Sequence, residues 1–444
     1  MQTILVAGAG KSSTYLIHYL LSIATRNKWK VIIMDENADA IAEKIRVNGY
    51  ASAEPAVIDV TNIKQREPLV KRADIVISLM PPHLHIHLAK DCLRHKKNLI
   101  TSSYISPEIR EMQKDVKEAG LMFMCEMGLD PGIDHMTASQ IIHSIQRVAA
   151  SITSFKSYCG GLVAPESDDN PWHYKFSWNP RNIINAGKDG AKYLLNGKYV
   201  DVPYEKIFDH NKKIKVNELG PLAYYPNRDS LHYLESYDVP EVKNFMRATL
   251  RHPGFCKGWN ALVALGLTDD KDHINDGSLT YAGWVKSKAS YKNNSTLPEH
   301  VANKLNIPGD DKVLSMLQWL GLFEDKLVPS KTTSSADILL DLLLDKWQMK
   351  PEEKDMVVMQ HEIEYIHKGK KIKTTSTMTL KGENKEHSAM AKTVGLPMGI
   401  LAKMILTKKI NPPKGVLIPN MPSVYRPLLT ELNHHGISFT DEVE

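Results

Sequence analysis

The sequence predicts an α/β protein: a Rossmann-type, doubly wound parallel sheet, followed by a mixed α/β domain with an inserted helical subdomain. Three observations predict it. Short β-branched runs alternate with amphipathic segments over the first 130 residues, a glycine-rich loop joins the first strand to the first helix, and a mostly helical stretch precedes two long alternating segments. Alternating strands and helices are typical of a parallel sheet covered on both faces.

The expected elements of the first domain follow from these patterns in order. Buried strands are predicted at residues 3–7, 30–34, 56–58, 74–79, 98–100 and 121–123. Helices are predicted at 14–24, 38–47, 85–95 and 107–120, where apolar residues recur at helical spacing.

After this domain the pattern changes. A helix is expected at 133–148, with Asp130 as its N-cap and Pro131 in its first turn, and a strand at 154–161. Residues 240–350 are expected to be mostly helical, 356–380 to form a long antiparallel hairpin, and 388–406 to form a helix.

A chain of 444 residues exceeds one ordinary hydrophobic core. We therefore expect a dinucleotide-binding domain at 1–128, and a substrate-binding and dimerisation domain at 129–387 that contains the helical subdomain. The segment 388–444 is expected to return to the Rossmann domain.

Composition and charge narrow the range of possible functions. The hydrophobic fraction of 42% and the charged fraction of 24% are those of a globular protein, and the net charge of +5 gives no support for nucleic-acid binding. We find no apolar run of the ~18 residues that a membrane span needs and no signal-peptide pattern at the N-terminus. The cysteines, four in all and widely spaced, fit a reducing environment, so a cytoplasmic protein with no membrane partner is expected.

The glycine-rich loop carries the first chemical signal. Gly8-Ala9-Gly10-Lys11-Ser12-Ser13 is a GxGxxG pattern with serine in its third slot. The first glycine permits a tight turn, the second lets the backbone approach a pyrophosphate, and a small third residue permits close helix packing. A P-loop is excluded, because Leu5 stands where that motif needs its first glycine. The loop predicts dinucleotide binding.

Asp35 ends the second predicted strand, and Glu36 adds a second negative charge. A carboxylate at this point accepts hydrogen bonds from the ribose hydroxyls of NAD and repels the 2′-phosphate of NADP. NAD is therefore the predicted cofactor, with NADP as the alternative. A solvated acidic turn is the other interpretation.

Other residues at the carboxyl ends of predicted strands are expected to line the cofactor crevice. They are Asp59 and Val60, Leu79, and the run Thr101-Ser102-Ser103-Tyr104. Turn formation is the alternative explanation for the hydroxyl run.

Several further motifs occur in a characteristic order. They are Gly128-Leu129-Asp130-Pro131-Gly132-Ile133-Asp134-His135, Ser157-Tyr158-Cys159-Gly160-Gly161-Leu162, Tyr174-Lys175-Phe176-Ser177-Trp178, Tyr225-Pro226-Asn227-Arg228-Asp229-Ser230 and Thr249-Leu250-Arg251. Together with Thr101-Ser102-Ser103-Tyr104 they resemble the saccharopine dehydrogenases of the L-glutamate-forming type, over nearly the whole chain.

This resemblance implies a reversible hydride transfer. Saccharopine is oxidised at its secondary amine by NAD(P), and water then releases L-glutamate and 2-aminoadipate 6-semialdehyde. Fungal biosynthetic members carry arginine near the position of Asp35 and use NADPH, so this chain fits an NAD-linked role in lysine degradation better. NADP-linked lysine biosynthesis stays open, and a homodimer is expected by analogy.

The resemblance also implies site residues. The cofactor should contact Gly10, Lys11, Ser12, Ser13, Asp35, Asp59, Val60, Thr101, Ser102, Leu129, Asp130, Pro131 and Ser177, to which the loop and strand positions add Gly8 and Leu79. The substrate should contact Ser103, Tyr104, Arg228, Thr249, Leu250 and Arg251.

The chemistry of the substrate agrees, because bidentate arginine orients carboxylates and saccharopine carries three of them. A surface ion pair is the alternative for Arg228 or Arg251. Tyr104, Asp130 and Cys159 are the titratable candidates for proton transfer, although Asp130 as a helix cap, Cys159 as a packed thiol and protons carried by water are also open.

No metal site is expected: His83, His85 and His87 alternate as the chain enters a helix, so their side chains do not converge. Two rival functions remain. A carboxynorspermidine-type imine reductase would need carboxylates rather than arginines for its polycationic substrate, and a non-catalytic dinucleotide-sensing protein would bind cofactor without turnover.

Overall fold

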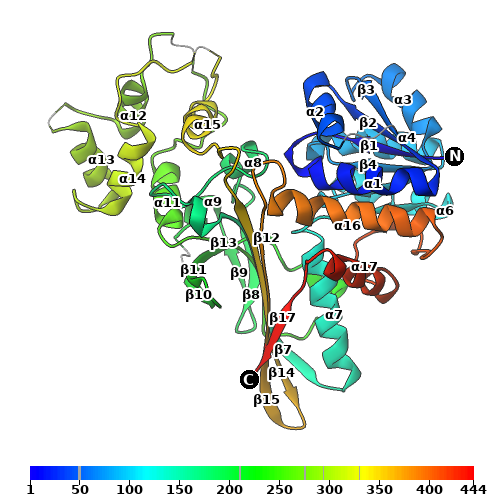
Figure 1. Ribbon diagram of the computed structural model, residues 1–444. Helices are drawn as coiled ribbons and strands as arrows, with labels where there is room; N and C mark the ends of the chain where they lie inside the picture. Colours follow the sequence, from blue (N-terminus) through cyan, green and yellow to red (C-terminus); the bar gives the residue numbers. More distant parts are fainter. Residues whose placement is uncertain (49–51, 210–211, 275–276, 294, 330) are drawn as a thin grey trace. The chain divides into compact units, whose positions relative to one another are not determined.

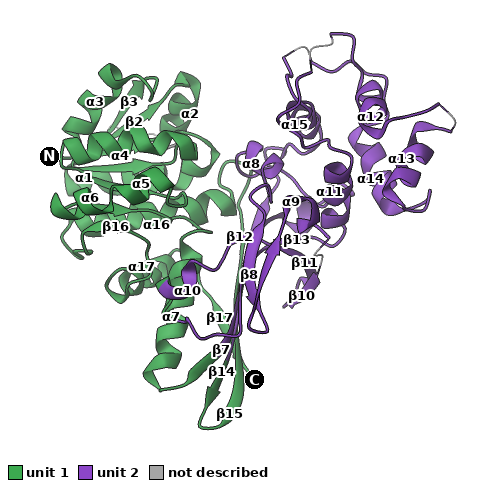
Figure 2. Ribbon diagram, turned by 180° about the vertical axis from the view of Figure 1, so that it is seen from behind, with its two compact units in different colours: residues 1–152, 236–238, 365–444 green, residues 153–235, 239–364 purple. Residues whose placement is uncertain are grey.

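The computed structural model describes residues 1–48, 52–209, 212–274, 277–293, 295–329 and 331–444. The chain divides into two compact units, which Figure 2 shows in separate colours. Unit 1 comprises Met1–Ile152, Ser236–Asp238 and Tyr365–Glu444, and unit 2 comprises Thr153–Glu235 and Val239–Glu364. Each unit thus combines segments that are far apart in the sequence.

Unit 1 contains a parallel sheet with strand order β16-β6-β5-β4-β1-β2-β3. The strands are β1 (Gln2–Ala7), β2 (Trp29–Asp35), β3 (Ala53–Val57), β4 (Ile75–Ser78), β5 (Asn98–Thr101), β6 (Met122–Met124) and β16 (Gly415–Leu417). The order 3-2-1-4-5-6 is that of a doubly wound dinucleotide-binding fold, which confirms the predicted fold class.

The helices of unit 1 alternate with these strands (Figure 1). They are η1 (Lys11–Ser13), α1 (Thr14–Asn27), α2 (Ala38–Asn48), α3 (Ile63–Arg72), η2 (Pro82–Leu84), α4 (His85–Arg94), α5 (Pro107–Glu111), α6 (Gln113–Glu118), α7 (Ile133–Arg147), α16 (Ala389–Leu406) and α17 (Pro422–His434). The helix expected at 107–120 is interrupted at Met112, and its first part is capped by Ser106, whose Oγ accepts from the amide of Ile109. The periodicity had not indicated α3.

The loop before α7 differs from the sequence expectation. Gly132, with φ of 147°, is the N-cap of α7, and its amide donates to Asp134 Oδ1 at 2.6 Å. The expectation that Asp130 caps this helix is wrong: the backbone crosses back on itself between Gly128 and Gly132, and the helix begins three residues after Asp130.

Helix α16 packs closely on α1. A Cβ atom on Gly395 would lie 2.8 Å from the backbone nitrogen of Leu16, so only glycine permits this approach. By length and composition α16 could also span a membrane, although Lys392 and Lys403 interrupt its apolar run. Because 72% of it is buried inside the protein, α16 has the character of a core helix.

The C-terminal residues of unit 1 complete a second pairing. Strand β15 (Lys370–Lys381) pairs antiparallel with β17 (Thr440–Val443), with Thr374 opposite Val443. The hairpin predicted at 356–380 is confirmed, because β14 (Asp355–His367) and β15 follow one another in the chain and are neighbours in the sheet.

Unit 2 contains a mixed sheet, in which neighbouring strands have the order β10-β11-β13-β7-β14. Its strands are β7 (Ser151–Val163), β8 (Ala191–Leu195), β9 (Lys198–Val202), β10 (Lys212–Val216), β11 (Gly220–Pro226), β12 (Arg228–Asp229), β13 (Asn244–Arg251) and β14. Strand β13 runs parallel to β7 and antiparallel to β11.

Helices cover the core of unit 2 and form the helical region predicted between residues 240 and 350 (Figure 1). Within that range lie α11 (Phe255–Ala264), α12 (Tyr281–Ala289), α13 (Leu297–Leu305), α14 (Lys312–Leu320) and α15 (Ser335–Lys346). The short elements η3 (Pro165–Ser167), α8 (Arg181–Ile184), α9 (Tyr204–Ile207) and α10 (Tyr233–Ser236) come earlier in the chain. Trp172, Trp259, Trp284 and Trp347 are all fully buried in this core. Large aromatic side chains thus supply much of the apolar area that holds unit 2 together.

Candidate functional site

The glycine-rich loop of unit 1 has the geometry of an anion-binding turn. After β1 the chain passes through Gly8, with φ of 103°, to Gly10, and then enters η1 and α1. The amide and hydroxyl of Ser13 both bond to the carbonyl oxygen of Gly10, at 3.0 and 2.8 Å. The loop therefore leads directly into a helix N-terminus, where unpaired amides favour phosphate groups.

The two glycines of the loop meet different surroundings. A Cβ atom on Gly8 would lie 3.1 Å from the backbone of Leu79, so this glycine permits the close approach of two strand ends. A Cβ atom on Gly10 would meet nothing within 4 Å. Open space beside Gly10 at a helix N-terminus fits a dinucleotide pyrophosphate.

The charges around the loop are mixed. Lys11 is exposed and interacts electrostatically with Lys44, Lys385 and Glu386. The ammonium group of Lys44 is buried, donates to Thr14 at 2.7 Å and pairs with Glu386 at 2.8 Å. The sequence alone could not indicate that Lys385 and Glu386, over 370 residues away, join this neighbourhood.

Asp35 lies at the end of β2, beside the same loop. Its Oδ2 atom accepts a hydrogen bond of 2.7 Å from the amide of Ala9, and its Oδ1 atom accepts one of 2.9 Å from the amide of Asn37. The carboxylate is therefore held between the loop and the start of α2.

The next predicted cofactor residues lie at the carboxyl ends of β3 and β4. Asp59 is exposed, and its pKa is lowered because its carboxylate accepts hydrogen bonds from the hydroxyl and amide of Thr61. Val60 is buried and its carbonyl accepts from Arg66. Leu79 donates its amide to Ala7.

The Thr101–Tyr104 segment lies against the loop that precedes α7. The amides of Met127 and Glu126 donate to the carbonyls of Thr101 and Ser103, both at 3.0 Å. A Cβ atom on Gly128 would lie 3.1 Å from the Cβ of Ser102. The structure thus brings together two predicted segments, 101–104 and 128–132.

Tyr104 and Asp130 meet in this region. The hydroxyl of Tyr104 donates to Asp130 Oδ1 at 3.1 Å, and both side chains are half-buried. Leu129 and Pro131, on either side of Asp130, are buried. A phenol and a carboxylate in contact form a unit through which a proton can be held or passed.

A buried polar group beneath this region was missed by sequence reasoning. His135 Nε2 lies 2.8 Å from Glu126 Oε2, and its Nδ1 lies 2.6 Å from the hydroxyl of Tyr237. Glu126 Oε1 also accepts from the amide of Ile105 at 3.2 Å. No sequence pattern indicated these partners of His135.

Arg251 is the most informative predicted residue in unit 2. It is 4% exposed, and its guanidinium lies over the rings of Tyr174, Tyr225 and Phe255 at 5.4, 5.8 and 5.4 Å. Its Nη1 group donates to the carbonyl of Leu250 at 2.8 Å, and Nε has no hydrogen-bond partner among the described residues. Among the residues that the structure describes, no carboxylate pairs with it. A buried cation without a counter-ion is costly unless a ligand supplies one.

Other predicted residues of unit 2 lie next to Arg251 on the sheet. Thr249, Leu250 and Arg251 end β13, and Cys159 lies opposite Thr249 on the neighbouring parallel strand β7. A Cβ atom on Gly160 would lie 2.6 Å from the carbonyl oxygen of Leu250, so glycine permits this close approach. Cys159 is buried and is not part of a disulfide bond.

Ser177 and Arg228 lie elsewhere in unit 2. Ser177 is buried, in the segment that also supplies Tyr174, whose hydroxyl accepts from the indole of Trp178 at 2.9 Å. Arg228 is about half exposed and forms a 2.5 Å ion pair with Asp189. The alternative interpretation of a surface ion pair thus describes Arg228 in this structure, whereas Arg251 has the burial expected of a carboxylate-binding residue.

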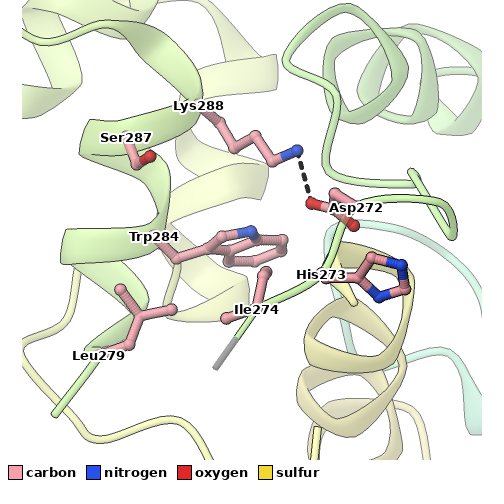
Figure 3. Close-up of a pocket in the computed structure, with 7 residues that line it drawn as sticks. All are labelled: Asp272, His273, Ile274, Leu279, Trp284, Ser287 and Lys288. Atoms are coloured by element: carbon pink, nitrogen blue, oxygen red, sulfur yellow. Dashed lines mark ion pairs between the residues drawn. The ribbon is translucent and has the colours of Figure 1, made fainter. Parts of the chain in front are cut away.

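A hollow in the helical region of unit 2 has a volume of about 420 Å³ (Figure 3). Trp284, Ile274 and Leu279 form its apolar side, and Lys288 pairs with Asp272 at 2.7 Å across it. None of the predicted site residues is among the described side chains that line it. It therefore adds nothing to the predicted site.

Both the N-terminal and the C-terminal regions of the chain match models of one protein family. Residues 4–124 match the family model described as the saccharopine dehydrogenase NADP binding domain, and residues 128–437 match the saccharopine dehydrogenase C-terminal domain. A solved structure described as apo histidine-tagged saccharopine dehydrogenase (L-Glu forming) from Saccharomyces cerevisiae is similar over 100% of both chains, with 32% identity and a TM-score of 0.88.

Curated relatives are of two lengths. The chain is 35% identical to the mitochondrial alpha-aminoadipic semialdehyde synthase of Bos taurus over 99% of this chain and 47% of that protein, so it spans about half the length of such relatives. It is 32% identical to the saccharopine dehydrogenase [NADP(+), L-glutamate-forming] of Schizosaccharomyces pombe, over 100% of this chain and 99% of that one. The corresponding Saccharomyces cerevisiae protein is 36% identical over 89% of this chain and 92% of its own length.

Proposed function

Because the chain belongs to the saccharopine dehydrogenase family, we propose that it oxidises saccharopine to L-glutamate and 2-aminoadipate 6-semialdehyde, with reduction of a nicotinamide dinucleotide. The resemblance drawn from the sequence motifs is thereby confirmed at the level of the family. The names of the L-glutamate-forming relatives and of the similar structure support this reaction. It belongs to lysine metabolism.

The buried guanidinium of Arg251 is the observation that carries the proposal. Its surroundings are aromatic rings and thiols rather than carboxylates, so a substrate carboxylate would complete its coordination. Saccharopine carries three carboxylates, whereas a carboxynorspermidine-type substrate carries a single carboxylate on an otherwise polycationic chain. The proposal therefore favours saccharopine over a carboxynorspermidine-like substrate.

The cofactor is a nicotinamide dinucleotide, as the match to an NADP binding domain supports. Gly8, Gly10 and the N-terminus of α1 would hold its pyrophosphate, and Gly10 has the open space that this requires. When bound, the cofactor accepts the hydride from the carbon beside the secondary amine of the substrate.

We assign NAD as the preferred cofactor, which differs from the NADP(+) in the names of the fungal relatives. The support is Asp35, whose carboxylate lies at the glycine loop, where it would repel a 2′-phosphate. Lys11 and Lys385 act in the opposite direction, because their charges attract phosphate. Initial rates measured with NAD and with NADP decide which of these effects is larger.

Tyr104 and Asp130 are the proposed groups for proton transfer. Hydride loss requires the neutral amine, so a base must accept its proton before oxidation, and water must then add to the imine. The hydrogen-bonded pair can accept that proton at Asp130 and keep the phenol oriented toward it. Cys159 is a second candidate, next to Thr249 on the sheet.

The test is the initial rate of the purified protein with saccharopine, with NAD and NADP compared at the absorbance band of the reduced nicotinamide. Turnover with NAD preferred supports the reaction and the role of Asp35. Turnover with NADP preferred keeps the reaction but favours lysine biosynthesis. Absence of turnover despite cofactor binding contradicts the proposal and favours the dinucleotide-sensing alternative. Light scattering of the same preparation tests the expected homodimer.

A further inference from the structure

His85 is a buried titratable residue that the proposed mechanism does not use. It begins α4, directly after η2, and it is 2% exposed. Its ring lies between the carboxyl ends of the neighbouring strands β4 and β5, where Ser78 and Thr101 are paired. This edge of the sheet carries the predicted cofactor and substrate residues.

Three hydroxyl groups surround the His85 ring. Nδ1 lies 2.7 Å from Ser78 Oγ, and Nε2 lies 2.8 Å from Ser103 Oγ. Thr101 Oγ1 lies 3.1 Å from Nε2 and also accepts from the amide of Ser103 at 3.3 Å. One imidazole therefore links the end of β4 to the hydroxyl of Ser103, a predicted substrate residue.

The protonation state of the ring follows from its surroundings. Burial, with a smaller contribution from His83, lowers the pKa of His85 to about 4, so the ring is neutral near pH 7 and has one donor and one acceptor. Ser78 is fully buried, and within the described ranges its hydroxyl has no hydrogen-bond partner other than Nδ1. A buried hydroxyl hydrogen without an acceptor is costly, so Ser78 donates to Nδ1 and the ring hydrogen lies on Nε2.

This tautomer determines the direction of the Ser103 hydroxyl. Nε2 donates to Ser103 Oγ, so the hydroxyl hydrogen of Ser103 stays available for an acceptor outside the protein. Ser103 is partly exposed, and its carbonyl is held separately by the amide of Glu126. The ring thus acts on the side chain of Ser103, while other contacts hold its backbone.

We propose that His85 is a positioning residue, whose Nε2–H group orients the Ser103 hydroxyl to donate to a carboxylate oxygen of the substrate. The inference rests on the proposed function, because saccharopine is the carboxylate-bearing ligand. Ser78 takes part by holding the ring in the required tautomer. Neither His85 nor Ser78 touches the substrate.

The test compares two substitutions at His85 whose side-chain amide nitrogens replace different nitrogens of the imidazole ring. In His85→Gln the side-chain amide nitrogen reaches the place of Nε2 and can still donate to Ser103, whereas in His85→Asn it reaches only the place of Nδ1. We expect the KM of saccharopine to rise about tenfold in His85→Asn and less than about threefold in His85→Gln, as for loss of one hydrogen bond to a charged group. The KM of the cofactor stays unchanged in both.

A double-mutant cycle separates positioning from a general structural effect. If His85 acts through Ser103, His85→Asn causes no further rise in the saccharopine KM when Ser103→Ala is already present. Ser78→Ala is the second variant, for use if a His85 variant does not fold. This substitution removes the hydroxyl that fixes the tautomer of His85. It should raise the KM of saccharopine several-fold, but only while Ser103 is present.

Each outcome has a distinct meaning. Equal KM values for the Asn and Gln variants, or additive effects in the cycle, overturn the role of His85 while the proposed function stands. Absence of saccharopine turnover in the unsubstituted protein overturns the proposed function and this inference with it.

Discussion

The carboxylate of Asp35 accepts a 2.7 Å hydrogen bond from the amide of Ala9, which lies between the two glycines of the cofactor loop. The residue proposed to select the cofactor is thus bonded to the loop proposed to bind its pyrophosphate. A substitution at Asp35 therefore changes a contact of the loop as well as a charge beside it.

Asp35→Asn keeps the side-chain oxygen that can accept from Ala9 but removes the negative charge. We expect the ratio of kcat/KM for NAD to that for NADP to fall about tenfold, because repulsion of the 2′-phosphate is lost. Initial rates with both cofactors measure the ratio. Asp115→Asn, on the exposed surface of α6, is the control, and an unchanged ratio in Asp35→Asn would remove Asp35 from cofactor selection.

Arg251→Gln tests the buried cation of unit 2. Loss of a charge-assisted hydrogen bond costs about 1.5–3 kcal/mol, so the KM of saccharopine should rise about 10- to 100-fold, with the KM of the cofactor unchanged. The unfolding midpoint should not fall, since the substitution removes a buried charge that no carboxylate of the described residues neutralises. Lys198→Gln, exposed on β9, is the control, and an unaltered saccharopine KM in Arg251→Gln would contradict the assignment.

Tyr104→Phe and Asp130→Asn test whether the phenol and the carboxylate act as one unit. Each single variant should lower kcat about tenfold or more, and the double variant should be little slower than the slower single one, because the groups share one hydrogen bond. Multiplicative losses would show that they act independently. Asp115→Asn, on the exposed surface of α6, provides the matched control.

Stability should depend on pH through His85. Its folded-state pKa of about 4 lies below the ordinary value of 6.5, so the unfolded chain binds the proton more tightly. The contribution to stability is present above pH 6.5 and is lost as pH falls toward 4, by at most about 3 kcal/mol. Chemical denaturation of the unsubstituted protein and of His85→Gln between pH 4 and 7 measures it, and parallel pH profiles would contradict the buried, neutral histidine.

Tyr237→Phe removes one partner of His135 in the buried Glu126–His135–Tyr237 group. The free energy of unfolding should fall by about 1–3 kcal/mol, because a buried ring nitrogen loses its 2.6 Å partner. Guanidinium denaturation gives the value. Tyr199→Phe, at a side chain that is 76% exposed, should have no effect, and equal losses in the two variants would show that the buried hydrogen bond contributes nothing.

The elements that the sequence predicted well depend on local signals. Apolar runs gave most strands and helices of the first domain to within a few residues, although β3 begins three residues earlier than predicted and Met112 interrupts one helix. Helix α3 was not predicted, because its interior Pro68 and many charged residues obscure its periodicity. Asp130 was misplaced as a cap because capping depends on the path of the whole 128–134 loop.

The sequence by itself determined the fold class, the cofactor loop and the family, because β-branched runs, glycine spacing and ordered motifs are read along the chain. Only the tertiary structure decided which side chains are buried together. It placed β16 beside β6, about 290 residues earlier in the chain, it left Arg251 buried without a carboxylate partner among the described residues, and it put His85 between Ser78 and Ser103. Burial and hydrogen-bond partners depend on residues that are far apart in the sequence, so no local periodicity predicts them.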